Sequence, residues 1–333
     1  MKAPPATGRR VLLFAGAVLA LALAVLASIA FGSHPTSLGD VVAVLSGTAD
    51  PNLVTVVESR YPRTALGILA GLCLAVAGTL MQGVTRNPLA DPGLLGITAG
   101  ASAAVVTSIA FLGAAGQGGA VWWALPGALL AGLVVHVIGS AGGGGGVARL
   151  VLAGAVVTAV LSAYVQAVTL SLPRVFDSYR YWVVGALGGR DFPVLWSVLP
   201  LAVAGLVLAV LLAPGLNTLA LGDQSAAALG ASPALMRAGG LLAAILLSTA
   251  ATAAVGPIAF VGLAVPHIAR AMSGVDMRAQ IAFSAVVGPA LLLLADVAGR
   301  IVLQPQELMV GVITAFIGAP ALLLAVRRMR GTS

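Results

Sequence analysis

Apolar runs of about twenty residues recur along the whole of this sequence, and they restrict its fold more than any other feature. An α-helix rises 1.5 Å per residue, so about twenty residues cross a hydrocarbon layer roughly 30 Å thick. We therefore predict an all-α polytopic membrane protein that forms a single domain over residues 1–333. About ten transmembrane helices are expected, at residues 11–31, 64–84, 93–113, 120–140, 147–171, 193–214, 235–256, 258–272, 280–302 and 309–327. The first run is too long for the apolar part of a signal peptide, which is about 7–15 residues.

The composition supports this class and excludes several functions. Hydrophobic residues make up 60% of the chain and charged residues only 8%, against about 25% charged in soluble domains. Lys2 is the only lysine, so the chain lacks the internal lysine of a Walker A phosphate loop and ATP must be bound elsewhere. Cys73 is the only cysteine, and no cluster of His, Asp or Glu predicts a catalytic residue, a metal site or a cofactor.

Basic residues predict the orientation in the membrane. On the expected N-terminal side lie eleven Lys and Arg residues, and on the other side lie six arginines. Cytoplasmic loops gather basic residues, so both termini are predicted to be cytoplasmic. This distribution also accounts for the net charge of +7 without nucleic acid as a partner. The six arginines on the far side need a further explanation.

Stripes of small residues predict close helix packing. Gly71, Ala75 and Gly78 fall on one helical face with Gln82 at its cytoplasmic end, and Gly93, Gly96 and Gly100 form a similar stripe in the next span. Small residues let membrane helices approach each other closely. The run 142–146, all glycine, predicts a flexible cytoplasmic linker.

The fifth predicted span carries a polar stripe, Thr158, Ser162, Gln166 and Thr169, and Thr314 belongs to a weaker stripe in the tenth. Polar groups at membrane depth face the bundle interior or a water-filled cavity. A neutral pathway wall and hydrogen bonding between helices explain the stripe about equally well. The stripe has no ionisable member, which argues against a proton-coupled carrier.

Three shorter segments suggest specific structures. Residues 215–234 predict a short helix with Asp223 as its N-cap and Gly230 as its stop, before a span capped by Ser232; such a folded cytoplasmic loop fits a partner protein. Residues 257–270 contain two prolines and predict a short or kinked helix. Asp296 and Arg300 are four residues apart, as in an ion pair within a helix; alternatively, Asp296 positions Arg300 for an acidic external partner.

Six motifs resemble the FecCD family of permeases from binding-protein-dependent ABC importers. They are R-Y-P-R (60–63), A-V-A-G-T-L-M-Q (75–82), R-N-P-L-A-D-P-G-L-L-G (86–96), L-A-L-G-D-Q-S-A-A-A-L-G (219–230), F-V-G-L-A-V-P-H-I-A-R (260–270) and V-G-V-I-T-A-F-I-G-A-P (310–320). The resemblance implies the type II ABC importer permease fold in a bacterial inner membrane. It also implies a second permease subunit, identical or paralogous, two ATPases that bind ATP and Mg, and an external binding protein.

The resemblance also implies residue roles. Arg60, Arg63 and Arg300 match the arginines that receive acidic residues of the binding protein. The coupling segment, about 216–232, matches the part that meets the ATPase, through Leu221, Gly222, Asp223, Ala226, Leu229 and Gly230. The translocation pathway is expected along Thr158, Ser162, Gln166, Thr169 and Thr314, with Gln82.

The cargo is predicted from the same resemblance. Residues 180–191, 251–262 and 291–300 are most similar to ferric-siderophore permeases of the ferric-enterobactin type, whereas Met309 stands where many haem and vitamin B12 permeases have proline. We therefore expect a ferric siderophore, with haem or vitamin B12 as the alternative. A stand-alone secondary carrier is a more distant alternative, and the sequence does not name the siderophore.

Overall fold

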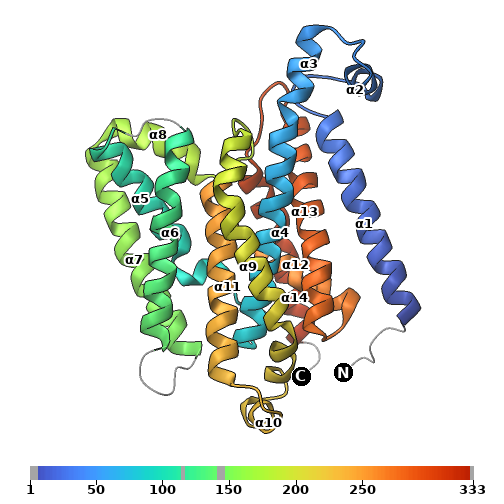
Figure 1. Ribbon diagram of the computed structural model, residues 1–333. Coiled ribbons are helices and arrows are strands. Elements are labelled where there is room, and N and C mark those ends of the chain that lie inside the picture. Colours follow the sequence, from blue (N-terminus) through green and yellow to red (C-terminus); the bar gives the residue numbers. More distant parts are fainter. Residues whose placement is uncertain (1–6, 114–116, 141–146, 331–333) are drawn as a thin grey trace.

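The computed structural model describes residues 7–113, 117–140 and 147–330, and within these ranges all regular elements are helices (Figure 1). The helices are α1 (Thr7–Ala30), α2 (Leu38–Leu45), α3 (Pro51–Glu58), α4 (Arg60–Thr85), the 3₁₀ turn η1 (Pro92–Leu95), α5 (Ile97–Phe111), α6 (Gln117–Ser140), α7 (Val147–Ser171), α8 (Pro173–Val183), α9 (Phe192–Leu219), α10 (Asp223–Ala228), α11 (Pro233–Val255), α12 (Val261–Ser273), α13 (Met277–Val302) and α14 (Val310–Arg330).

Each of the ten predicted spans coincides with one of these helices. Seven spans are long and apolar enough to cross a membrane by length and composition, namely those at α1, α4, α6, α7, α9, α11 and α13. The helices α5, α12 and the described apolar part of α14 are shorter. As predicted, α12 is short, with 13 residues and Pro266 inside it.

The long helices run side by side and divide into two groups that meet at α11 (Figure 1). The helices α5, α6 and α7 pack together, α4 packs against α11, α12 and α13, and α1 lies along α13. The most buried spans are those at α4 and α11, each with 78% of its apolar window inside the protein. These two helices therefore form the centre of the bundle.

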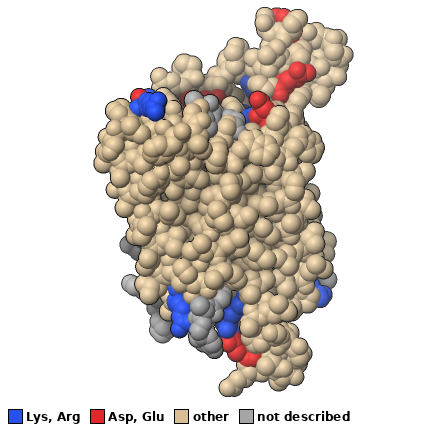
Figure 2. Space-filling view, turned by 60° about the vertical axis from the view of Figure 1, so that its left-hand side comes forward, with Lys and Arg blue, Asp and Glu red and all other residues tan. Residues whose placement is uncertain are grey.

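Charged side chains gather at the two ends of the molecule and leave a broad uncharged band between them (Figure 2). The short helices α2, α3 and α8 lie at one end, and α10 lies at the other, where both described chain ends are also found (Figure 1). This arrangement fits a protein that crosses a membrane an even number of times. We call the end with α2 and α3 the outer end and the end with α10 the inner end.

The predicted packing role of the small residues is confirmed. A Cβ atom added to Gly78 would overlap the carbonyl oxygen of Gly262 in α12. One added to Gly71 would lie 2.6 Å from the Cα atom of Pro289 in α13. The helices thus approach each other at backbone distance, which a larger side chain would prevent.

Several local predictions need correction. The third span does not begin at Gly93: η1 and a left-handed Gly96 precede α5, which starts at Ile97. The helices α3 and α8 lie between the predicted spans and were not expected. The predicted linker 142–146 lies outside the described residues. Ser232 caps α11 as expected, and Ser37 caps α2, because their side chains accept hydrogen bonds from the N–H groups of Leu235 and Asp40.

Candidate functional site

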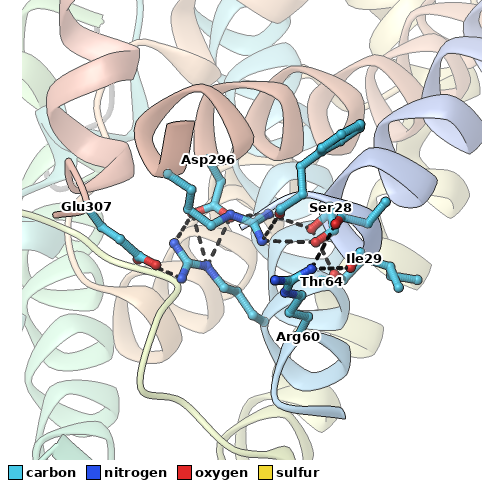
Figure 3. Close-up of polar contacts among 10 residues, drawn as sticks. Ser28, Ile29, Arg60, Thr64, Asp296 and Glu307 are labelled. Atoms are coloured by element: carbon cyan, nitrogen blue, oxygen red, sulfur yellow. Dashed lines mark hydrogen bonds and ion pairs between the residues drawn. The ribbon is translucent and has the colours of Figure 1, made fainter. Parts of the chain in front are cut away.

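An ionic network occupies the outer end of the bundle and joins α4 to α13 (Figure 3). Asp296 in α13 accepts hydrogen bonds from Arg63 at 2.8 Å and lies 2.9 Å from the guanidinium of Arg300. The second end of the Arg63 guanidinium donates to Glu307 at 2.8 Å. The predicted pair of Asp296 and Arg300 is confirmed, and it belongs to a larger cluster of two carboxylates and three arginines with Arg60.

Arg60 and Arg300 bind the carbonyl groups at the C-terminal end of α1. Arg60 donates to the carbonyls of Ile29 and Ala30 at 2.8 and 2.9 Å, and Arg300 donates to those of Ser28 and Phe31, both at 2.9 Å. The last carbonyls of a helix lack partners within the helix and carry a partial negative charge. Guanidiniums from α4 and α13 satisfy them, so these two side chains hold α1 against the bundle.

Arg60, Arg63 and Arg300 were expected to face outward and to receive acidic residues of a binding protein, but two of these side chains are buried. Arg300 is 1% exposed and Arg60 6%, because both insert beneath the end of α1. Arg63 stays at the rim, with its side chain 14% exposed. A cavity of about 330 Å³ opens beside the cluster and is lined by all three arginines, by Arg190 and by Glu307. Docking of a partner here remains a prediction.

Glu307 is a member of this site that sequence reasoning missed. It lies in the loop between α13 and α14, which turns through a cis peptide bond at Gln304–Pro305. Burial disfavours its charge, but the charge and hydrogen bond of Arg63, a hydrogen bond of Ser33 and the charge of Arg300 together outweigh this, so the pKa of Glu307 lies below its usual range. Its carboxylate is therefore charged at neutral pH. A lone acidic residue 244 positions from Arg63 gives no spacing signal in the sequence.

The inner end presents the predicted coupling segment. Leu221 and Leu229, on either side of α10, are 65% and 64% exposed, whereas Ala226 is fully buried. Gly230 follows the helix with a φ of +81°, which confirms it as the stop signal. The exposed leucines that flank this short helix provide an apolar surface that a partner protein would cover.

Asp223 does not cap α10 as predicted. The N-cap position is Gly222, and no side chain caps the helix. The carboxylate of Asp223 instead pairs with Arg86, which follows α4, and with Arg237 of α11 at 2.7 Å. Hydrogen bonds from Arg237 and Arg86 hold the pKa of Asp223 below its usual range, against a smaller opposing effect of desolvation.

The residues predicted to line a pathway fall in different environments. Thr158, Ser162 and Thr169 are half-buried on the mostly exposed helix α7, and Gln166 is exposed. The hydroxyl of Thr169 donates to the carbonyl of Val165 in its own helix. Thr314 lines an apolar cavity of about 350 Å³ between α12, α13 and α14. Gln82 is 2% exposed and donates to the carbonyl of Leu263, so it lies in the packing between α4 and α12 and not on an open wall.

A second polar cavity was not expected. It measures about 200 Å³ and is lined by Asp91, Thr98, Ser248 and Thr252 together with Leu74 near the middle of α4. Asp91 lies between the predicted spans 64–84 and 93–113, where a cytoplasmic loop was expected, but the chain after Arg86 turns back into the bundle. Asp91 then caps η1 by accepting a hydrogen bond from the N–H of Gly93 at 2.7 Å.

The fold and these two charged ends define a polytopic helical membrane protein. The sequence profile of the FecCD transport family matches residues 20–328. The ferric enterobactin transport system permease protein FepD of Escherichia coli is 45% identical over 94% of each chain. The siderophore transport system permease protein YfiZ of Bacillus subtilis is 35% identical over 93% of this chain and 94% of that protein.

A solved metal-chelate type ABC transporter, in an inward-facing conformation, has the same fold. It aligns with a TM-score of 0.83 and 24% identity, covering 95% of this chain and 99% of that one. The chain belongs to the FecCD transport family. It is a transport subunit and not an enzyme, which agrees with the missing phosphate loop.

Proposed function

We propose that this chain is the permease subunit of an ATP-driven importer of ferric siderophores in a bacterial inner membrane. The match that carries the proposal is the 45% identity to the ferric enterobactin permease over 94% of both chains. Both termini are on the cytoplasmic side, the coupling segment with Leu221 and Leu229 meets the ATPase, and the outer ionic cluster faces the binding protein.

The complete importer contains a second permease subunit, identical or paralogous, and two ATPases that bind ATP and Mg. We assign the contact with the second permease to the exposed face of α7 and to the cavity between α12, α13 and α14. Support comes from Ser162 and Gln166, which place polar groups on an apolar helix surface, and from Thr314 in the cavity. Thr158 and Thr169 lie on the same polar edge of α7 as Ser162 and Gln166. The cargo passes between the two permeases by alternating access.

Transport by the reconstituted complex tests this function. The complex is placed in vesicles with its ATPase, and a siderophore-binding protein is added on the outside. We expect uptake of an iron-labelled ferric catecholate siderophore that requires ATP and stops when the ATPase has lost its catalytic residue. Haem and cobalamin serve as competing cargoes.

Three results would contradict the proposal. Uptake of haem or cobalamin in place of the siderophore would change the cargo and keep the importer class. Uptake that survives the inactive ATPase would show a secondary carrier. Uptake without the binding protein would remove the assigned role of the outer cluster.

A further inference from the structure

The coupling helix α10 is joined to the rest of the chain by two glycines with left-handed backbone conformations. Gly222 has a φ of +106° and Gly230 a φ of +81°, and a Cβ added at either would meet no atom within 4 Å. These glycines are present for their backbone conformation and not for close packing. The main chain therefore makes a turn at each end of α10, between it and the neighbouring helices α9 and α11.

Ion pairs between side chains also connect the start of α10 to α4 and α11. Both oxygens of Asp223 accept hydrogen bonds from Arg237 of α11, at 2.7 and 2.8 Å, and one of them also accepts from Arg86. Arg86 is the residue at which α4 ends, and its φ of +51° is unusual for a residue with a side chain. One carboxylate at the start of α10 thus holds the inner ends of the two most buried spans, at α4 and α11.

The contact between Arg86 and Asp223 lies at one end of α4, which runs through the centre of the bundle. Its 26 residues extend about 39 Å as one continuous helix. Arg63 in its first turn pairs with Asp296 in the outer cluster, and Arg86 at its other end pairs with Asp223. A helix in the centre of the bundle is thereby tied by ion pairs at both ends of the molecule.

We propose that Asp223, Arg86 and Arg237 form an ionic clamp through which movement of the coupling helix is transmitted to α4 and α11. The clamp rests on the proposed function, because it needs an ATPase that displaces α10. Since its side chains are partly exposed, the clamp contributes little to folding stability. Its effect is expected in the coupling between ATP hydrolysis and transport.

The test uses the reconstituted complex and compares Asp223→Asn, Arg237→Gln and the double variant. Arg278→Gln is the matched control, because Arg278 is exposed at the inner end and its side chain has no ion pair within the described structure. We expect the amount of siderophore transported per ATP to fall roughly tenfold in each single variant, within the usual range for coupled sites. The double variant should be no worse than Asp223→Asn alone, because that change already removes the ion pairs with both Arg237 and Arg86.

Several outcomes overturn the clamp. One is unchanged transport per ATP in both single variants, and another is additive loss in the double variant. Loss of the ATPase from the purified complex of Asp223→Asn would assign Asp223 to docking in place of transmission. Absence of ATP-driven uptake by the unaltered complex would overturn the proposed function itself, so the two failures are distinguishable.

Discussion

At the scale of single residues, Asp296 is the group on which the outer cluster depends. Its side chain is 1% exposed and neutralises Arg63 and Arg300 on two different helices. Arg63 has a second carboxylate in Glu307, whereas Arg300 has no other acidic partner among the described residues. A buried ion pair adds little over an apolar pair, but removal of one partner leaves a charge without compensation.

Replacement of Asp296 by Asn should therefore lower the free energy of unfolding by about 3–5 kcal/mol. The reason is that Arg300 stays buried under α1 without a counter-charge. Thermal unfolding of the purified permease would measure the loss.

Glu307→Gln is the matched control, since it removes a carboxylate of the same cluster that is 34% exposed. That change should alter stability by less than about 1 kcal/mol. Equal losses in the two variants would contradict the role assigned to burial.

At the scale of the elements, the crossing of α4 and α12 depends on the absence of side chains. The segment before α12 ends at Phe260, which has a left-handed φ of +70°, and α12 then starts beside the middle of α4. Gly78 and Gly262 allow the two backbones to touch. The short helix is thus placed by contact with α4, since its 13 residues extend only about 20 Å.

The change Gly78→Ala should reduce stability by about 2–3 kcal/mol or prevent folding, because the added methyl group would overlap the carbonyl of Gly262. The yield of folded protein and its unfolding temperature measure this effect. Gly16→Ala in α1 is the control, since a Cβ there meets nothing within 4 Å and alanine favours the helix. A mild effect at Gly78 would mean that α12 can shift to make room.

At the scale of the whole molecule, the two charged ends are connected through the centre of the bundle. Arg63 and Arg86 lie near opposite ends of α4, and each pairs with an acidic residue on another element. Among Arg60, Arg63 and Arg300, the least buried ion pair is that of Arg63 with Glu307. An acidic residue of a binding protein would compete with Glu307 for the same guanidinium.

We expect Glu307→Gln to strengthen the affinity for the binding protein several-fold, because it frees one end of the Arg63 guanidinium for a charge-assisted bond. Arg63→Gln should weaken the affinity, and its effect should shrink as salt is raised. Binding to the permease in nanodiscs measures both. Docking that is insensitive to both changes would show that the binding protein uses another surface.

Much of this fold follows from local sequence properties. Ten apolar runs predicted ten spans, since the length of a helix and the thickness of a membrane are general quantities. Gly71 and Gly78 predicted close packing because a helical period places them on one face. Ser232, Pro233 and Gly230 marked the ends of helices near the inner end, because capping depends on a few adjacent residues.

Other features were decided by contacts between distant segments. Asp223 looked like an N-cap, but Arg86 lies 137 positions away and takes its carboxylate for an ion pair. Asp91 follows a cytoplasmic turn in the sequence, yet the chain re-enters the bundle after it.

The sequence by itself determined a polytopic helical permease and its family, because apolar length, small-residue spacing and motifs are local. Only the tertiary structure decided that Arg60 and Arg300 hold α1 and that Glu307 pairs with Arg63. A guanidinium is equally suited to a partner's carboxylate and to the carbonyls of a neighbouring helix. Which of these it meets depends on how the helices pack.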